Sequence, residues 1–256
     1  MIKKIISFTL RYIPRKYLQL VSHFVLKIWS FFLKGDKVEC TVCNARYNKF
    51  LPYGRLIVRD NALCPSCLAL ERHRLMYLYL KEKTNFFSAK LKVLHIAPEY
   101  CFLDRFEQMK NLDYITADIE SPLAKIKMDV HQVPFEDETF DVIFCNHVME
   151  HVDDFVLAMS ELNRVLKKDG FAIIQSPQDY NRANTYEDPS ITDPKEREIH
   201  FLQNDHLRLF GRDYNHELEK GGFKVKEDFF VQEMNPALVQ RYGLPKNEII
   251  YFCQKG

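Results

Sequence analysis

Strand-like and helix-like segments alternate regularly over residues 91–256, and this alternation limits the possible folds more than any other feature. The apolar, strand-like runs are 91–96, 113–118, 125–129, 140–146 and 171–175, and helical patterns occur at 100–109, 153–167 and 214–220. Such an order is typical of a parallel sheet with helices on both faces. We therefore predict an α/β, Rossmann-like fold. Two last strands, 223–231 and 248–253, are expected to pair as a closing hairpin, and 176–205 to form a polar loop.

The helix predicted over 153–167 has the clearest end signals. Asp153 or Asp154 precedes its apolar stripe and is a candidate N-cap. Gly170 follows the pattern and is interpreted as a stop signal just past the end of the helix.

The chain of 256 residues is long enough for one full α/β domain and a small appendage. We divide it into a basic amphipathic arm (1–37), a four-cysteine module with a docking helix (38–90), and the α/β domain (91–256).

The arm holds eight Lys or Arg and one acid, so its formal charge is +7, whereas the rest of the chain carries −6. Its apolar stretch, 18–33, is interrupted by polar residues and is too short for a membrane span, which needs about 20 largely apolar residues. The mixture of aromatic and cationic side chains favours an interfacial helix on a membrane surface. A helix packed on the rest of the chain or on a partner subunit is an equal alternative.

Four of the seven cysteines form two C-x-x-C pairs, Cys40 with Cys43 and Cys64 with Cys67, separated by 20 residues. This spacing is typical of tetrahedral zinc sites. Four thiolates leave no open coordination position, so we predict a structural zinc ion. The odd number of cysteines argues against a disulfide framework and favours a reducing cytoplasm. The interfacial-helix interpretation of the arm would then place it at the cytoplasmic face of the membrane.

The stretch between the cysteine pairs combines basic and aromatic side chains, namely Arg46, Lys49, Arg55 and Arg59 with Tyr47, Phe50 and Tyr53. This mixture is consistent with nucleic-acid binding, or with a small core surrounded by solvated charges. The following helix, 69–81, is expected to dock the module, and a substrate-facing role for Arg72 or Arg74 is a second interpretation.

Candidate cofactor-binding residues follow the predicted strands, because open α/β sheets bind ligands beyond the carboxyl ends of their strands. They are His95, Ala97 and Glu99 after the first strand, Asp118 and Ile119 after the second, Asp129 and Val130 after the third, and Asn146 after the fourth. A carboxylate at Asp118 can accept hydrogen bonds from both ribose hydroxyls, and Asp129 can accept one from an adenine amino group.

Residues 129–177 contain a series of short motifs in a fixed order. They are Asp129, Pro134-Phe135, Phe140-Asp141, MEHV at 149–152 and RVLKKDG at 164–170. This block closely resembles the central part of class I S-adenosylmethionine-dependent methyltransferases, and the resemblance extends over 91–256. It implies S-adenosylmethionine as the cofactor, and a seven-stranded sheet with one antiparallel strand.

Three further motifs are LERHR at 70–74, VLHIAPE at 93–99 and DHLRLFG at 205–211. Together with the cysteines they look like a bacterial methyltransferase subgroup whose members are often associated with cell-surface polysaccharide or glycolipid synthesis. The resemblance implies a glycan, a glycolipid or another small molecule as acceptor. The first loop of the family is usually glycine-rich. Here Ala97, Glu99 and Cys101 replace those glycines, so Glu99 is a candidate to hold the methionine amino group or the ribose.

The reaction implied is an in-line displacement at a sulfonium-bound methyl group, for which orientation supplies much of the rate. A base near the methyl group assists an oxygen or nitrogen acceptor. His147, at the end of a predicted strand, is the candidate base, with Glu150 and His151 next; a merely structural His147 is an equal alternative. The candidate acceptor contacts are Tyr180, His206 and Arg208, of which Arg208 suits a phosphate or carboxylate.

Three other functions are compatible with parts of the sequence. His147 to His151 matches H-x-x-E-H, an inverted zinc-protease motif that requires both histidines on one helix. A non-catalytic zinc-containing adaptor is a second alternative, against which Asp118 and Asp129 speak. The third is an RNA methyltransferase that uses the zinc module, and the near-neutral total charge argues against it.

Overall fold

The computed structural model describes residues 30–54 and 58–256, which form two compact units. The smaller unit contains the described residues up to Leu78 together with Met234–Lys246, and the larger contains Tyr79–Glu233 and Asn247–Gly256. Most of the predicted amphipathic arm lies outside the described residues. Within the described part of the chain, no helix is long and apolar enough to cross a membrane.

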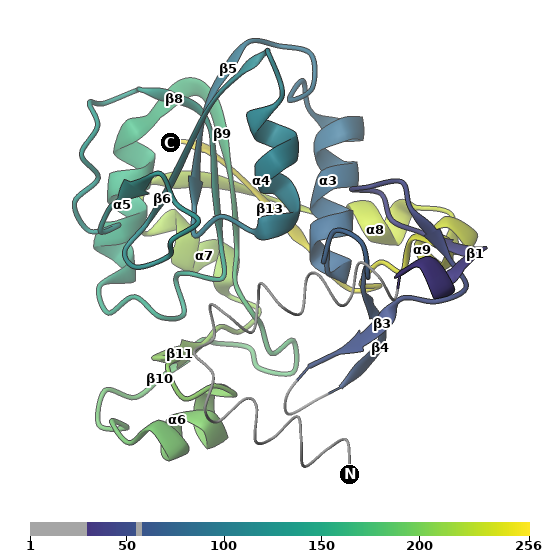
Figure 1. Ribbon diagram of the computed structural model, residues 1–256. Coiled ribbons are helices and arrows are strands. Elements are labelled where there is room, and N and C mark those ends of the chain that lie inside the picture. The colour runs from purple at the N-terminus through teal and green to yellow at the C-terminus, as the bar shows by residue number, and fades with distance from the viewer. Residues whose placement is uncertain (1–29, 55–57) are drawn as a thin grey trace. The chain divides into compact units, whose positions relative to one another are not determined.

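The larger unit is built on a seven-stranded sheet (Figure 1). Across the sheet the strands are β12 (Phe223–Asp228), β13 (Ile250–Lys255), β9 (Leu166–Gln175), β8 (Phe140–Asn146), β5 (Leu91–Ile96), β6 (Leu112–Asp118) and β7 (Ile126–Lys127). β13 pairs antiparallel with both neighbours, and every pair from β9 to β7 is parallel. The predicted α/β, Rossmann-like fold and its one antiparallel strand are confirmed.

The order of the strands reverses beside β5. From β5 the chain adds β6 and β7 on one side, and it then crosses over to add β8 and β9 on the other. In an open α/β sheet, a crevice forms at the carboxyl ends of the strands where the order reverses. The segments that begin at Ala97, Ile119 and His147 therefore leave the sheet at one edge.

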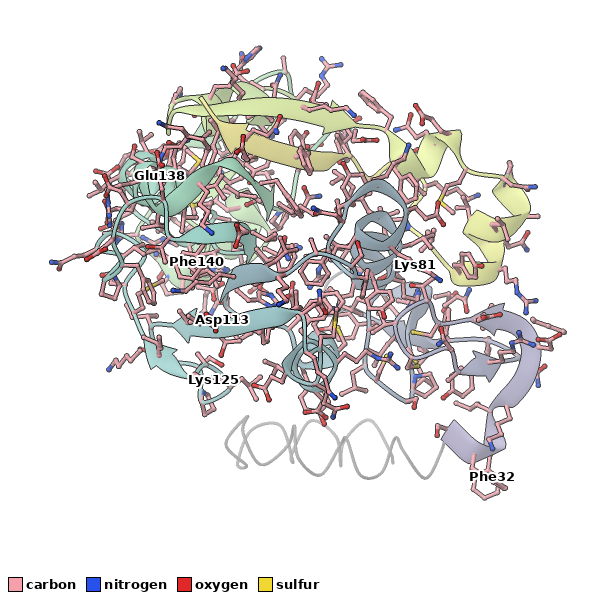
Figure 2. The ribbon with its side chains drawn as sticks, turned by 90° about the horizontal axis from the view of Figure 1, so that it is seen from above. Phe32, Lys81, Asp113, Lys125, Glu138 and Phe140 are labelled. Carbon is pink, nitrogen blue, oxygen red and sulfur yellow. The ribbon has the colours of Figure 1, made fainter. Side chains whose placement is uncertain are left out.

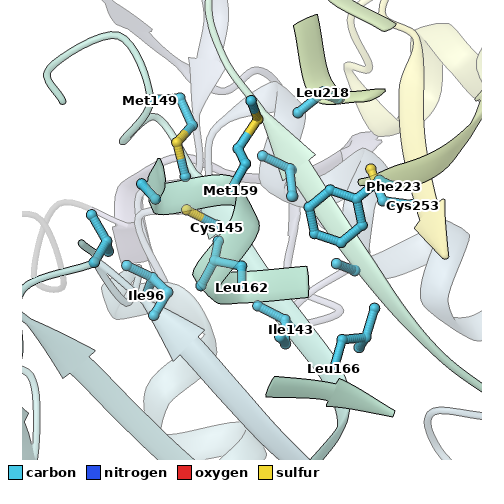
Figure 3. Packing of buried hydrophobic residues seen from close by; sticks show 14 of the residues in the cluster. Ile96, Ile143, Cys145, Met149, Met159, Leu162, Leu166, Leu218, Phe223 and Cys253 are labelled. Carbon is cyan, nitrogen blue, oxygen red and sulfur yellow. The ribbon is translucent and has the colours of Figure 1, made fainter. Parts of the chain in front are cut away.

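One face of the sheet is covered by α5 (Phe155–Val165) and α7 (Tyr214–Glu219). Figure 3 shows Met159 and Leu162 of α5 over Ile143 and Cys145 of β8, and all four side chains are buried. Because successive strand residues point to opposite faces, Ile143 and Cys145 face these helices whereas Phe144 faces the other side.

The opposite face carries an aromatic cluster around α4 (Tyr100–Glu107). Phe102 and Phe106 stack with ring centroids 5.1 Å apart, and the Phe106 and Phe144 centroids are 6.2 Å apart. Figure 2 shows this sheet from above, with Asp113 near the start of β6 and Phe140 at the start of β8. The two apolar layers fix the positions of the strand ends.

The end of α5 differs from the prediction. The helix stops at Val165 and β9 begins at Leu166, so Gly170 lies inside β9 and is not a helix stop. The register between β8 and β9 is irregular here, and a Cβ added to Gly170 would lie 2.7 Å from the carbonyl oxygen of Asp141. Close backbone approach, rather than helix termination, explains this glycine.

The predicted polar loop over 176–205 contains regular structure. It includes β10 (Tyr186–Glu187), which pairs with β11 (Arg208–Leu209), and the helix α6 (Pro194–Phe201). Ile191, Phe201 and Leu209 form a small apolar cluster of their own. β12 and β13 pair as predicted, but they are joined by a long connection that includes α8 (Phe230–Glu233) and α9 (Pro236–Tyr242), and not by a tight turn.

The described part of the smaller unit contains two short antiparallel strand pairs, the start of one helix and the whole of another. β1 (Lys34–Glu39) pairs with β2 (Arg46–Tyr47), and β3 (Leu51–Tyr53) pairs with β4 (Arg59–Leu63). The helix α3 (Glu71–Lys83) begins in this unit and ends in the larger one, and α9 also belongs to the smaller unit.

Arg74 is fully buried inside the smaller unit and holds its parts together. Its guanidinium stacks on the Phe50 ring at 4.1 Å and donates to four main-chain carbonyls at 2.7–2.9 Å, namely those of Ala62, Ala69, Tyr242 and Gly243. With its donors used in this way, Arg74 does not face a substrate.

Candidate functional site

A cavity of about 910 Å³ opens at the carboxyl edge of the sheet, entirely within the larger unit. Its walls come from the segments that follow β5, β6, β7 and β8, and from the stretch before β11. The lining residues are Ile96, Ala97, Asp118, Ile119, Glu120, Met128, Asp129, Val130, His131, His147, Val148, His151, Val152, Asp153, Asp154, Asp205 and Leu207. Seven of the predicted cofactor and catalytic residues meet here, although they are far apart in the sequence. The two candidate N-cap residues, Asp153 and Asp154, also line the cavity.

Asp118 is the last residue of β6 and lies on the cavity wall. Its Oδ1 accepts hydrogen bonds from the main-chain N–H groups of Glu120 at 2.7 Å and Ser121 at 2.6 Å. These bonds fix the orientation of the carboxylate, while Oδ2 has no hydrogen-bond partner within the described residues. A fixed carboxylate with one free oxygen is suited to accept hydrogen bonds from a diol.

Asp129 and Val130 follow β7 and also line the cavity. The Asp129 Oδ1 accepts from the main-chain N–H of His131 at 2.9 Å and lies 2.7 Å from the ring Nδ1 of the same residue. These two hydrogen bonds lower the pKa of Asp129. His131 was not among the predicted residues; its position two residues after Asp129 was the available signal.

The first loop is organised differently from the prediction. His95 is fully buried, with Nε2 2.5 Å from Glu99 Oε2 and Nδ1 2.6 Å from the Tyr114 hydroxyl. The other Glu99 oxygen accepts from Asn146 at 3.1 Å. His95, Glu99 and Asn146 thus form a network behind the cavity wall and do not line it; of this predicted group, Ala97 does line it.

Ala97 occupies the position where a glycine is usual, and it has φ 48°, in the left-handed region. Its main-chain N–H donates to the carbonyl of Ala117 at 2.9 Å, which ties the loop to β6. A non-glycine residue in this region stores strain that the surrounding hydrogen bonds must hold. The first loop therefore has a left-handed backbone conformation at an alanine rather than at a glycine.

His147 directly follows β8, with φ 56°, and lines the cavity. Its main-chain N–H donates to the carbonyl of Gln175 at 2.7 Å, and its Nδ1 lies 3.3 Å from Glu150 Oε1. Glu150 is 1% exposed, and its Oε2 accepts from the Ser176 hydroxyl at 3.0 Å. Burial acts to raise the pKa of Glu150, but the interaction with the nearby imidazole of His147 outweighs it, so the pKa is lowered.

His151 and His206 meet beside Glu150, with ring centroids 4.7 Å apart. The His151 Nδ1 lies 3.2 Å from the carbonyl oxygen of Asp205, and the His206 Nδ1 lies 2.9 Å from that of Phe201. His206 is 2% exposed, and burial lowers its pKa. His151 lines the cavity, whereas His206 lies behind it.

Arg208 is buried and does not face an acceptor. Its guanidinium donates to Glu187 at 2.8 and 3.1 Å and to three main-chain carbonyls, those of Met149, Val152 and Asp153, at 2.5–3.0 Å. The predicted role in binding a substrate phosphate or carboxylate is therefore wrong, because its donors are used within the fold. Tyr180, the third predicted acceptor contact, is 38% exposed and does not line the cavity.

The H-x-x-E-H match does not form a helix. Residues 147–151 form a turn between β8 and α5, and the helix begins only at Phe155, with Asp154 as its N-cap. Two histidines four residues apart share a metal when a helix places them on one face, so the protease interpretation loses its geometric basis.

The four paired cysteines converge in the smaller unit. The Sγ atoms of Cys40 and Cys67 are 3.6 Å apart, those of Cys43 and Cys64 are 3.7 Å apart, and all four lie within 4.8 Å of one another. Zinc–thiolate bonds of about 2.3 Å in a tetrahedron place sulfurs about 3.8 Å apart, so the cluster has the size of such a site.

The two cysteine turns have the same backbone design. The N–H of Cys40 donates to the carbonyl of Ala45, and that of Cys64 donates to the carbonyl of Ala69. In each turn the residue after the second cysteine has a positive φ, 57° at Asn44 and 62° at Leu68. Two matched turns that aim four sulfurs at one point fit a metal better than they fit unconnected thiols.

Comparison with protein families gives a match to the model described as "Methyltransferase domain", over residues 87–174. That segment runs from before β5 to the end of β9 and includes Asp118, Asp129 and His147. The chain therefore carries a methyltransferase-family segment on a Rossmann-like fold.

Among curated proteins, the chain is 34% identical to demethylmenaquinone methyltransferase of Staphylococcus carnosus over 53 residues, which are 21% of this chain and 22% of that protein. It is 29% identical to sterol 4-C-methyltransferase strm-1 of Caenorhabditis elegans over 101 residues, 38% of this chain and 28% of that protein. The chain thus spans less than a third of the length of these relatives.

Among solved structures, an S-adenosylmethionine-dependent methyltransferase from Archaeoglobus fulgidus is similar with a TM-score of 0.47 and 16% identity, covering 71% of this chain and 93% of that one. One from Aquifex aeolicus has a TM-score of 0.46 and 16% identity, covering 70% and 88%.

Proposed function

We propose that this protein is an S-adenosylmethionine-dependent methyltransferase. The observation that carries the proposal is the cavity at the strand-order reversal, with Asp118 and Asp129 on its wall. The family match over 87–174 contains both carboxylates, so the sequence relationship and the cavity support the same activity.

The residues around the cavity fit the parts of the cofactor. Asp118, held by two main-chain N–H groups, would accept hydrogen bonds from the ribose hydroxyls. Asp129 would accept one from the adenine amino group, and Ile119, Met128 and Val130 offer apolar surface for the adenine ring. When bound, S-adenosylmethionine supplies a methyl carbon that passes to the acceptor atom, and the electron pair of the broken bond stays on sulfur.

His147 is suited to accept the proton that an oxygen or nitrogen acceptor loses. Glu150 lies beside its Nδ1, so the carboxylate would hold the proton on that nitrogen and leave Nε2 with a lone pair. This arrangement orients the imidazole as a base at the cavity wall. The geometry of His147 and Glu150 favours the catalytic interpretation of His147 over a merely structural one.

The acceptor would be a small molecule, such as a glycan or glycolipid headgroup. The cavity is confined within one unit, and the residues beyond the cofactor positions include His151, Asp205 and Leu207. An RNA acceptor has less support, because Arg46 of the cysteine module pairs with Asp36 and Glu39, and Arg59 pairs with Glu71. Paired arginines carry little free charge for phosphates.

Calorimetric titration with S-adenosylmethionine and S-adenosylhomocysteine tests the cofactor assignment. We expect binding by the full chain, and about 10- to 100-fold weaker binding by Asp118→Asn, because charge-assisted hydrogen bonds to the ribose become neutral ones. Asp113→Asn is the matched control, since Asp113 is an exposed residue near the opposite end of the same strand (Figure 2). Absence of binding to wild type, or unchanged affinity in Asp118→Asn, would refute the assignment.

The acceptor class can be found with a labelled methyl group. Cell extract is separated into lipid, glycan, RNA and protein fractions, and each is incubated with the protein and labelled cofactor. Label transferred to the glycan or lipid fraction supports the proposal, and label found only in RNA would favour the alternative.

We also infer that Cys40, Cys43, Cys64 and Cys67 bind a structural zinc ion. The spacing of the sulfurs and the two matched turns support this inference. Because all four ligands are protein thiolates, the ion would stabilise the fold of the smaller unit and leave no position for a substrate.

A further inference from the structure

Glu150, His151 and His206 bring three metal-ligating groups together in the larger unit. One potential ligand atom from each lies within 4.8 Å of the other two. Glu150 and His206 are 1% and 2% exposed, whereas His151 lines the cavity. The cluster thus reaches from the interior of the fold to the cavity wall.

The hydrogen bonds of the two histidines leave the same nitrogen available. Both Nδ1 atoms face main-chain carbonyls, which only accept, so each Nδ1 carries a hydrogen. The two Nε2 atoms then hold lone pairs. Metal-binding histidines typically donate their second ring N–H to a carbonyl or carboxylate in this way.

Two buried atoms of the cluster lack hydrogen-bond partners within the described residues. They are the Nε2 of His206 and the Oε1 of Glu150, although the latter lies 3.3 Å from the Nδ1 of His147. Oε2 of Glu150 is held by Ser176 at 3.0 Å, so Oε1, whose contact with His147 is longer, is the oxygen that can also take a ligand. Unpaired buried polar atoms cost free energy, and a shared cation would satisfy them together.

We propose that Glu150, His151 and His206 bind a divalent transition-metal ion, separate from the four-cysteine site. Two imidazoles and one carboxylate are a ligand set that such ions favour, and three protein ligands leave open coordination positions. Because His151 is on the cavity wall, an open position would face the cavity.

This site also indicates the class of acceptor, a step that rests on the proposed methyltransferase function. A cation beside a hydroxyl group lowers the pKa of that hydroxyl and orients it. His147 lies beside Glu150 and on the wall of the same cavity, where it can accept the proton that the hydroxyl loses. An acceptor with a hydroxyl group therefore fits the site better than an amine does.

Titration of the full chain, loaded with one equivalent of zinc, with cobalt(II), followed by calorimetry and by the visible spectrum, tests the site without the cofactor. Zinc retains the four-cysteine site, because it binds more tightly than cobalt and prefers thiolates. We expect one further cobalt ion per chain, without thiolate charge-transfer bands. Glu150→Gln and His206→Gln should bind it at least tenfold more weakly.

His216→Gln is the matched control, because His216 is an exposed histidine of the same unit and lies outside the cluster. Circular dichroism melting shows whether each variant is folded. If Glu150→Gln does not fold, His151→Gln takes its place, since His151 is partly exposed. Two results would overturn the proposal. One is a wild-type chain that binds no cobalt in addition to its zinc. The other is that the folded cluster variants bind cobalt as tightly as the wild type. Because no cofactor is present, either result is independent of whether S-adenosylmethionine binds.

Discussion

The Arg208 guanidinium is buried and serves the fold. It joins β11 to the turn after β8 through three main-chain carbonyls, and to β10 through Glu187. It also lies 4.5 Å from the centre of the Phe155 ring at the start of α5. One side chain thus holds the turn that carries His147, Glu150 and His151.

Replacing Arg208 with Ala should destabilise the protein strongly. The change removes the donor from three carbonyls, two of which are in buried hydrogen bonds. Breaking a buried charged network typically costs about 3–5 kcal/mol. Urea unfolding measures the loss, with Arg212→Ala as the control because Arg212 is exposed. A loss of less than about 1 kcal/mol, the usual range for a surface pair, would contradict this role.

Among single residues, Asp118, Asp129 and His147 lie where the sequence predicted, on the cavity wall. Asp118 ends β6, Asp129 lies two residues after β7, and His147 directly follows β8. The end of a strand fixes the position of the residues beside it. His95 lies inside β5 and Glu99 three residues after it, but neither lines the cavity. His95 instead contacts Tyr114 and Phe144, and Glu99 bonds to His95. The sequence did not show whether each side chain points into the cavity or into the aromatic layer, because Tyr114 and Phe144, which contact His95, come from other strands.

At the scale of elements, the end of α7 packs directly against α5. A Cβ added to Gly221 would lie 2.4 Å from the Cβ of Met159, a distance that real structures do not allow. The absence of a side chain at Gly221 therefore lets the chain pass α5 on its way to β12.

Gly221→Ala should destabilise the larger unit by about 1–3 kcal/mol, the usual cost of overpacking a core. Thermal unfolding checks this, with Lys224→Ala on the exposed side of β12 as the control. An unchanged melting temperature in Gly221→Ala would show that α5 and α7 can move apart freely.

Two helices that the sequence analysis missed begin in the same way. α6 starts at Asp193-Pro194 and α9 at Asn235-Pro236, and each Asx side chain accepts from main-chain N–H groups of the first turn. An Asx N-cap followed by proline is a recognised start signal for a helix. Both helices are short, so hydrophobic periodicity did not reveal them, but the start signals were present.

At the scale of the whole molecule, the smaller unit depends on its cysteines and on Arg74. Its strands have two to six residues and cannot by themselves bury a large core. Small units of this kind usually need a metal or disulfides for stability. The inferred zinc ion would supply that stability.

Elemental analysis should find zinc in the wild type and less zinc in Cys64→Ser, because the three remaining thiolates no longer complete the tetrahedron. Hydrogen exchange should then show less protection in the smaller unit, while the larger unit keeps its own core. Cys101→Ala is the control, since Cys101 lies in α4, outside the cluster. Equal zinc content in the wild type and Cys64→Ser would contradict the assignment.

The sequence alone determined the parallel sheet, most strand ends and the grouping of four cysteines, because these depend on local periodicity and spacing. It also predicted Asp118 and Asp129 at the cofactor edge, since a parallel sheet brings the carboxyl ends of its strands together. Only the tertiary structure decided that Arg208 is buried and that His206 meets Glu150 and His151. Those contacts join residues about 55 positions apart through the packing of a folded loop, and no local pattern encodes such a meeting.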